Sequence, residues 1–151
     1  MKLSTFTDYA LRVLIYLAAE PDRRATAAEI AGVFDVSLHH LAKVVHFLGQ
    51  SGWVRTVRGK GGGLELAQDP AGIVIGQVVR LAEGPARPAE CFSEPGRCAL
   101  TRICRLRGVL ADATEAFLAE LDRHTLADLV HGQPALGRVL RLTPPAPRRR
   151  A

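Results

Sequence analysis

The sequence predicts a mainly α-helical protein with one small β-hairpin, arranged as a winged helix-turn-helix domain followed by a long helix. Three observations predict this fold class. Apolar residues recur at helical spacing in three segments near the N-terminus. A basic, glycine-rich turn then separates two short β-strand patterns. A longer segment nearer the C-terminus carries an apolar heptad repeat, which is typical of a helix that packs along a narrow seam.

The first part of the chain is predicted to form three helices. Residues 7–19 place apolar side chains on one helical face. Thr26 and Glu29 match a capping box, in which the hydroxyl serves an orphan amide and the carboxylate reaches back; it opens a helix that runs to about Phe34. Ser37 caps the third helix, in which the expected buried stripe is Leu38, Leu41, Val44, Val45 and Leu48.

A hairpin and a fourth helix are predicted next. Residues 53–57 and 63–67 have strand patterns, and the basic turn 58–62 (RGKGG) lies between them. Residues 75–83 have a helical pattern, and glycine and proline directly after it end the helix. Helix, helix, turn, helix and hairpin is the element order of a winged helix-turn-helix.

The C-terminal part is predicted to contain a loop, a long helix and a tail. Residues 84–100 are rich in proline and glycine, and a helix is expected from about residue 100 to 122. Its seam is Ile103, Leu106, Leu110, Ala113 and Phe117. A narrow seam on so long a helix favours a homodimer, although packing on its own domain is the alternative. Thr125 caps a short helix over 126–130, and the chain beyond residue 132 is expected to be flexible.

Composition and charge limit the classes of protein that fit. With 48% hydrophobic and 23% charged residues among 151, wholesale disorder is excluded. No apolar run is long enough for a membrane span, and residues 10–19 lack the basic leader and cleavage site of a signal peptide, so a cytoplasmic protein is expected. Three of the five net positive charges lie in Arg148, Arg149 and Arg150, so the overall basicity is weak evidence for a nucleic-acid partner.

The start of the third helix is the candidate for reading DNA bases. In helix-turn-helix proteins this stretch enters the major groove of double-stranded DNA, where short polar side chains reach base edges. Leu38 and Leu41 are expected to face inward, which leaves an outward polar set of Ser37, His39, His40 and Lys43. Ser37 has a purely structural alternative as the cap. Metal binding by the histidine pair is disfavoured, since adjacent helical residues diverge.

The hairpin tip offers a second set of DNA contacts. Arg58 and Lys60 lie on a backbone freed by glycines and can enter a narrow minor groove or hold phosphates. A nucleotide-binding loop is the alternative, but a strand follows where that motif needs a helix. Arg55, at the base of the strand, is either a further contact or a solvated edge charge.

The three cysteines follow the pattern Cys91-x6-Cys98-x5-Cys104. Thiolates are the soft ligands that zinc and iron–sulfur iron prefer. Zinc sites usually show closely paired cysteines, which this pattern lacks, whereas the longer gaps suit an iron–sulfur cluster. A fourth ligand must then be an oxygen or nitrogen donor, an exogenous molecule or another subunit. The alternative is three reduced thiols without a metal.

Taken together, these motifs resemble the Rrf-type iron–sulfur transcription regulators. The similar segments are the opening 3–12 (LSTFTDYALR), the wing 58–63 (RGKGGG), the helix after it and the cysteine triplet. Residues 116–129 (AFLAELDRHTLADL) are especially similar to the nitric-oxide-sensing repressors of that family, and the resemblance covers about residues 1–131. It implies a homodimer on palindromic operator DNA, each subunit binding one cluster through Cys91, Cys98 and Cys104.

The resemblance also implies a fourth cluster ligand. In the branch that controls cluster biogenesis, a histidine three residues after the last cysteine completes the site, and Arg107 stands there in this chain. In some members of the nitric-oxide branch the ligand is an aspartate of the partner subunit, at the position of Asp8 here. Arg12, one turn on, can pair with Asp8 and fix it. The alternative for Asp8 is an ordinary acid in a helix's first turn. A [4Fe-4S] cluster is expected, with [2Fe-2S] as the alternative.

The resulting hypothesis is a transcription repressor that releases DNA when nitric oxide reacts with its cluster. The sequence contains no recognisable set of nucleophile and base and no carboxylate pair of the kind that catalysis uses, so an enzyme is not expected. Alternatives are a regulator of the same fold that senses oxidants or iron and cluster status, and an iron–sulfur carrier or electron-transfer protein. The expected organisation is a winged helix-turn-helix DNA-binding domain (1–83), a cluster-binding loop (84–100), a dimerisation helix with a short C-terminal helix (101–131) and a flexible tail (132–151).

Overall fold

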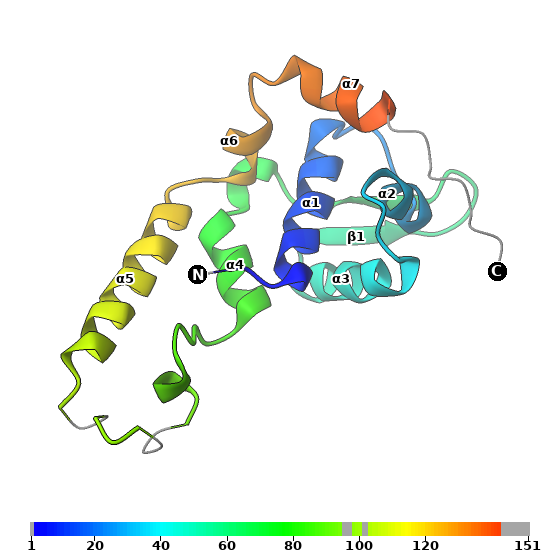
Figure 1. The fold of residues 1–151 in the computed structure, drawn as a ribbon. Helices are drawn as coiled ribbons and strands as arrows, with labels where there is room; N and C mark the ends of the chain where they lie inside the picture. Colours follow the sequence, from blue (N-terminus) through cyan, green and yellow to red (C-terminus); the bar gives the residue numbers. More distant parts are fainter. Residues whose placement is uncertain (1, 95–97, 101–102, 143–151) are drawn as a thin grey trace.

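The computed structural model describes residues 2–94, 98–100 and 103–142 of the chain. The elements are α1 (Thr5–Ala19), α2 (Ala27–Val33), α3 (Leu38–Gln50), β1 (Val54–Val57), β2 (Gly63–Leu66), the short 3₁₀ helix η1 (Pro70–Gly72), α4 (Ile75–Glu83), the short 3₁₀ helix η2 (Glu90–Phe92), α5 (Arg105–Asp122), α6 (Leu126–Val130) and α7 (Pro134–Leu142). Helix α1 stands between α4 and the remaining elements of the winged domain, and α5 extends away from them (Figure 1). The predicted fold class, mainly helical with one hairpin, is confirmed.

Helix α1 is the scaffold on which the winged domain packs. One face of α1 is fully buried and includes Ala10, Val13 and Leu14. Side chains from α3, α4 and β2 complete the same core, and burial of each large apolar side chain contributes about 1.5–3 kcal/mol. A shift of α1 is therefore felt by every element of the winged domain.

Helix α3 begins as predicted but its first residue is misassigned. The Ser37 hydroxyl accepts a hydrogen bond from the His40 amide at 3.2 Å. Leu41, Val44 and Leu48 are buried. Leu38, however, is 51% exposed, so its assignment to the buried stripe is wrong. Leu38 is the first residue of α3, and at this end of the helix no other element covers its side chain.

The capping box predicted at the start of α2 forms only in part. The Thr26 hydroxyl accepts from the Glu29 amide at 3.1 Å. The Glu29 carboxylate instead accepts a hydrogen bond from the Tyr16 hydroxyl at 2.7 Å and pairs with Arg23. A charge-assisted pair competes effectively with the weaker bond to the cap amide. Partial burial raises the pKa of Glu29, but the bonds from Tyr16 and Arg23 outweigh this and hold the pKa below its ordinary value.

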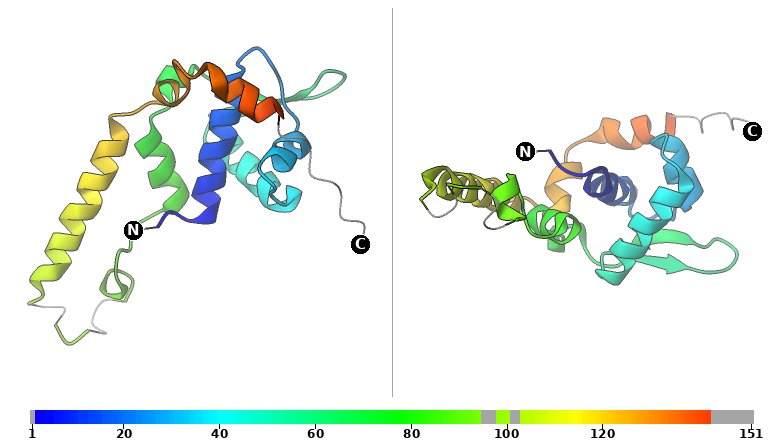
Figure 2. Two further views of the ribbon diagram at one scale, coloured as in Figure 1. Left: turned by 45° about the horizontal axis from the view of Figure 1, so that its top comes forward. Right: turned by 60° about the horizontal axis from the view of Figure 1, so that its bottom comes forward.

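The hairpin turn depends on glycine. Strands β1 and β2 pair antiparallel, with Val57 opposite Gly63 at the tip. A Cβ on Gly62 would lie 2.4 Å from the Val57 carbonyl oxygen, and Gly59 and Gly61 have φ angles of 97° and 76°. Both conditions favour residues without a side chain. The two ribbon views in Figure 2 show the hairpin projecting outward from the helices.

The end of α5 approaches α4 closely at a glycine. A Cβ on Gly76 would lie 2.8 Å from the backbone nitrogen of Asp122 and closer still to its carboxylate. The same carboxylate pairs with Arg80 at 2.5 Å, and Leu118 is buried. The C-terminal end of α5 is thus fixed to α4 of the winged domain.

We expect Gly76→Ala to destabilise the protein by about 1–3 kcal/mol, because the added methyl group forces α4 and α5 apart. Thermal unfolding followed by circular dichroism measures the effect. Gly108→Ala is the matched control, since Gly108 lies inside α5 and a Cβ there meets nothing within 4 Å. Alanine is the better helix former, so this control should be neutral or stabilising. Equal losses in both variants would contradict the proposed close approach.

Helix α5 begins at Arg105 and not near residue 100, so Ile103 of the predicted seam precedes the helix. Residues 101 and 102 lie outside the described part of the chain. The seam is largely exposed in the single chain: Ile103 is 78%, Leu106 61% and Phe117 38% exposed. Leu110 is half-buried, and the other seam residues are not covered by their own domain.

The C-terminal segment differs from the expected flexible tail, because residues 134–142 form α7. Pro134 is the first residue of this helix, a position where the backbone N–H has no partner in the helix and its absence costs nothing. In the sequence, the nearby Gly132 and Pro134 indicate a loop. Leu140 packs against the core, close to α1. Residues 143–151, including the three terminal arginines, lie outside the described residues. No helix in the described part of the chain is long and apolar enough to cross a membrane.

Candidate DNA-reading surface and cysteine loop

The structure places the predicted base-reading residues on the exposed side of α3. His39, His40 and Lys43 are all exposed, and the Ser37 hydroxyl accepts the bond that caps the helix. His46 and Gln50, further along α3, are exposed as well. Their spacing from Lys43 puts them on the same side of the helix, so the polar stripe is longer than the sequence analysis identified.

The wing carries two kinds of arginine and lysine. Arg58 and Lys60 are exposed at the tip and have no ion-pair partner among the described residues. Arg55 pairs instead with Glu65 at 2.6 Å, and Arg24 pairs with the other oxygen of that carboxylate at 2.5 Å. Hydrogen bonds from both arginines hold the pKa of Glu65 below its ordinary value. Arg55 is thus partly neutralised, whereas the tip keeps its charge.

An open groove of about 690 Å³ separates α3 from the wing. Its walls are mainly apolar and include Val45 and His46 on α3 and Thr56 and Leu64 on the hairpin. The groove thus lies between one side of α3 and the hairpin.

The cysteines lie on the segment that joins α4 to α5, far from the hairpin (Figure 1). None of the three forms a disulfide: Cys91 lies in η2, Cys98 is exposed, and Cys104 immediately precedes α5. Among the described residues, no three Cys, His, Asp or Glu side chains come together as a metal site. The donor chemistry fits an iron–sulfur cluster, but this loop conformation does not gather the donors.

Two aromatic contacts hold residues that the sequence analysis singled out. The Arg107 guanidinium lies over the Phe92 ring at 5.3 Å, which ties the start of α5 to η2. Asp8 and Arg12 form the expected ion pair at 2.8 Å, and both side chains are almost half exposed. Arg12 also lies over the Phe34 ring at 5.7 Å. Asp8 is thus oriented on the surface and remains accessible.

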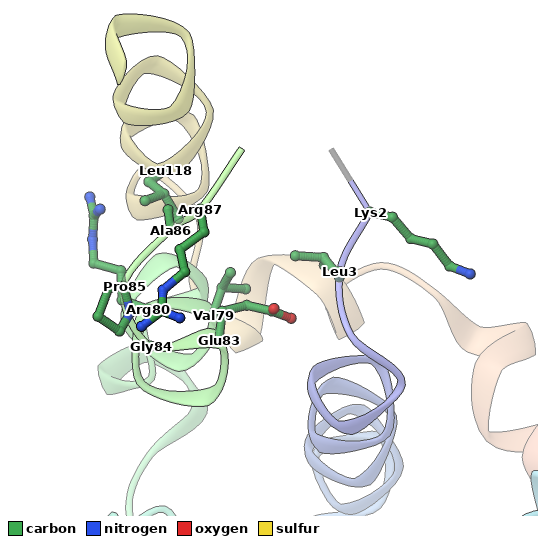
Figure 3. Close-up of a pocket in the computed structure, with 10 residues that line it drawn as sticks. All are labelled: Lys2, Leu3, Val79, Arg80, Glu83, Gly84, Pro85, Ala86, Arg87 and Leu118. Atoms are coloured by element: carbon green, nitrogen blue, oxygen red, sulfur yellow. The ribbon is translucent and has the colours of Figure 1, made fainter. Parts of the chain in front are cut away.

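A further contact near the cysteine loop went unnoticed in the sequence. The Glu83 carboxylate, at the end of α4, accepts a hydrogen bond from the Ser4 amide at 2.7 Å. Partial burial raises the pKa of Glu83, but bonds from the Thr7 hydroxyl and from Ser4 outweigh it and leave the pKa lowered. Figure 3 shows this carboxylate pointing toward the N-terminal segment at Leu3, across a hollow of about 440 Å³.

Comparison with known proteins identifies the family. Residues 3–132 match the Rrf2 family model, described as an iron-dependent transcriptional regulator. The regulator named NsrR in Geobacillus kaustophilus is 46% identical over 143 residues, covering 93% of this chain and 97% of that protein. The regulator named NsrR in Bacillus subtilis is 44% identical over 144 residues, covering 94% and 99%.

Solved structures agree with this assignment. CymR, the global cysteine regulator of B. subtilis, matches with a TM-score of 0.66 and 30% identity over 86% of this chain and 96% of that chain. IscR of T. potens matches with a TM-score of 0.70 and 25% identity over 86% of each chain. The relatives are named regulators and not enzymes, and the resemblance found in the sequence is confirmed. The chain belongs to the Rrf2 family of transcriptional regulators.

Proposed function

We propose that this protein is a repressor that binds palindromic operator DNA while it holds an iron–sulfur cluster, and that nitric oxide releases it. The observation that carries the proposal is that one chain has both a complete winged helix-turn-helix domain and three cysteines without a disulfide between α4 and α5. The relatives named NsrR support the nitric oxide signal. A carrier or electron-transfer protein has no use for an exposed recognition helix and a charged wing.

Cys91, Cys98 and Cys104 would hold the cluster, and the partner subunit's Asp8 is the proposed fourth ligand. The accessible, Arg12-oriented carboxylate supports this role for Asp8. When bound, the cluster would supply iron that reacts with nitric oxide, and the oxygen ligand from Asp8 would hold that iron less tightly than the three thiolates. The proposed cluster is [4Fe-4S], with [2Fe-2S] as the alternative.

The exposed apolar face of α5 supports a homodimer, since a second copy can cover it by two-fold symmetry. A palindrome requires two recognition helices about 34 Å apart, or one turn of the duplex. A small rotation of one head then removes half of the specific contacts. Loss of operator binding therefore needs only a modest movement of the cysteine loop relative to the heads.

The test is an anaerobic titration of the purified protein with nitric oxide, followed both by visible absorption and by binding to a palindromic operator. We expect the absorption and the specific DNA binding to disappear over the same range of added nitric oxide. Release by peroxide or by iron chelation, with no response to nitric oxide, would favour the oxidant or iron-status alternative. A coloured protein that never binds DNA specifically would favour the carrier.

The wing and the recognition helix should differ in how they contribute to binding. We expect Arg58→Gln or Lys60→Gln to weaken binding to all sequences and to lower the salt slope by about 0.9, because each loses one phosphate contact. Lys43→Ala or His40→Ala should cost about 1–3 kcal/mol and relax preference at one base pair. Competition among single-base operator variants at several salt concentrations separates the two effects.

Arg55→Gln is the matched control for the wing tip. Because Arg55 is already paired with Glu65, its removal should change the salt slope less than removal of Lys60. If Lys60→Gln altered base preference while the α3 variants did not, the assignment of recognition helix and wing would be wrong.

A further inference from the structure

The start of α1 is fastened to the end of α4 by one carboxylate. Glu83 Oε1 accepts a hydrogen bond from the Ser4 amide at 2.7 Å. Hydrogen bonding by Ser4 and Thr7 holds the pKa of Glu83 below its ordinary value. Ser4 and Thr7 are in turn joined through their hydroxyl oxygens at 3.0 Å. Thr7 is completely buried, whereas Ser4 and Glu83 are exposed, so the bond between them lies at the surface beside a buried residue of α1.

On one side of this fastening lies the cysteine loop. Glu83 is the last residue of α4, and Gly84 follows it with a φ of 67°, which turns the chain directly into the loop that carries Cys91. A change in the loop therefore acts first on the backbone beside Glu83.

On the other side lies the recognition helix. Phe6, between Ser4 and Thr7 in the sequence, packs edge-to-face against Phe47 of α3, with ring centroids 5.3 Å apart. Phe47 packs in the same manner against Trp53, which directly precedes β1, with centroids 6.1 Å apart. The first turn of α1 thus contacts α3 directly and is linked to the base of the wing through Phe47.

We propose that Glu83 is a positioning residue that transmits the state of the cysteine loop to α3, through its bond to the Ser4 amide, the bond between Ser4 and Thr7, and the contact of Phe6 with Phe47. This inference rests on the proposed function, since it takes the cysteine loop as the part that responds to the signal. It assigns the transmission to the chain's own α4–α1 contact, within one subunit.

Hydrogen bonds make this contact suited to switching. The bond to the Ser4 amide fails once the two atoms separate beyond about 3.5 Å, whereas apolar packing between α1 and α4 tolerates small slides. Loss of the bond leaves the amide of the α1 cap residue without its acceptor, and the first turn with Phe6 is freed to move. The aromatic contact then carries the displacement to α3.

The test is hydrogen exchange measured by mass spectrometry on peptides that cover residues 4–12, 38–53 and the cysteine loop at 84–104. Wild-type protein is compared with and without its cluster, and cluster-free protein is compared with and without iodoacetamide treatment of the three thiols. We expect both changes to alter exchange in α1 and α3. In Glu83→Gln we expect the changes in the loop to persist and those in α3 to shrink toward zero.

Two controls separate transmission from simple loss of structure. Arg87→Gln removes a charge from the same hollow without touching Ser4 or Thr7, so the response of α3 should equal that of the wild type. Glu83→Asp keeps the carboxylate and should restore part of the response, whether or not Glu83→Gln folds well. Combined with Phe6→Leu, Glu83→Gln should cause no further loss, because both act on one path.

The outcomes distinguish this inference from the proposed function. A wild-type protein that holds no cluster, but whose α3 still responds to thiol modification through Glu83, would sink the proposed function alone. A Glu83→Gln variant whose α3 responds as in the wild type would overturn the transmission role. The same holds if α3 of the wild type responds to neither treatment.

Discussion

Replacing Cys91, Cys98 or Cys104 singly with serine should remove the visible absorption of the anaerobically purified protein together with its specific DNA binding. The chain has three cysteines, so each substitution removes one of the three thiolate ligands that the chain can offer a cluster. Without the cluster, affinity should fall to the non-specific level, a loss of about 10³-fold or more. Iron content, visible spectra and operator-binding assays measure the two effects together.

Ser93→Ala is the matched control, because Ser93 is an exposed residue of the same loop with no donor of the required softness. It should keep both iron and operator affinity. Cys98 is exposed, so its replacement should leave thermal unfolding of the cluster-free protein unchanged. A serine variant with the full iron content would contradict the ligand assignment.

Leu106→Asp should convert the dimer to monomers and abolish binding to the palindrome. The Leu106 side chain is 61% exposed in the single chain, and its neighbour Val109 is exposed to the same extent, so the substitution costs little within one subunit. In a symmetric dimer it buries two carboxylates without partners, which is far more costly. Analytical ultracentrifugation at several concentrations measures the change.

Leu38→Asp is the control for introducing a charge at an exposed leucine. Leu38 is 51% exposed but lies on α3, so this variant should sediment as the wild type does, whatever its effect on DNA binding. A dimeric Leu106→Asp protein would show that α5 does not form the interface.

Local patterns in the sequence predict the elements whose structure depends on near neighbours. The bounds of α4 are those expected, and the caps of α2, α3 and α6 form because each cap and its amide lie three residues apart. The Glu29 carboxylate does not make its predicted bond to the cap amide, because it accepts a hydrogen bond from Tyr16 of α1 instead. A pattern within the α2 segment does not reveal this partner. Helix α7 was missed because its proline and the glycine before it read locally as a loop.

The candidate site shows the same division. The exposed residues of α3 and the wing follow from helical period and turn chemistry, and the Asp8–Arg12 pair from its spacing of four. The pairing of Arg24 with Glu65 and the bond from Ser4 to Glu83 span 41 and 79 residues. No local pattern reveals contacts between segments so distant in the chain.

The position of Trp53 makes the protein its own optical probe. It is the one tryptophan of the chain, it is 5% exposed, and its ring lies against Phe47 where the recognition helix meets the wing. Indole emission responds to solvent access and to nearby rings, so selective excitation of this tryptophan, at a wavelength that the two tyrosines do not absorb, reports on that junction. Stopped-flow fluorescence of the unlabelled protein can therefore time the movement of the recognition helix against the bleaching of a cluster.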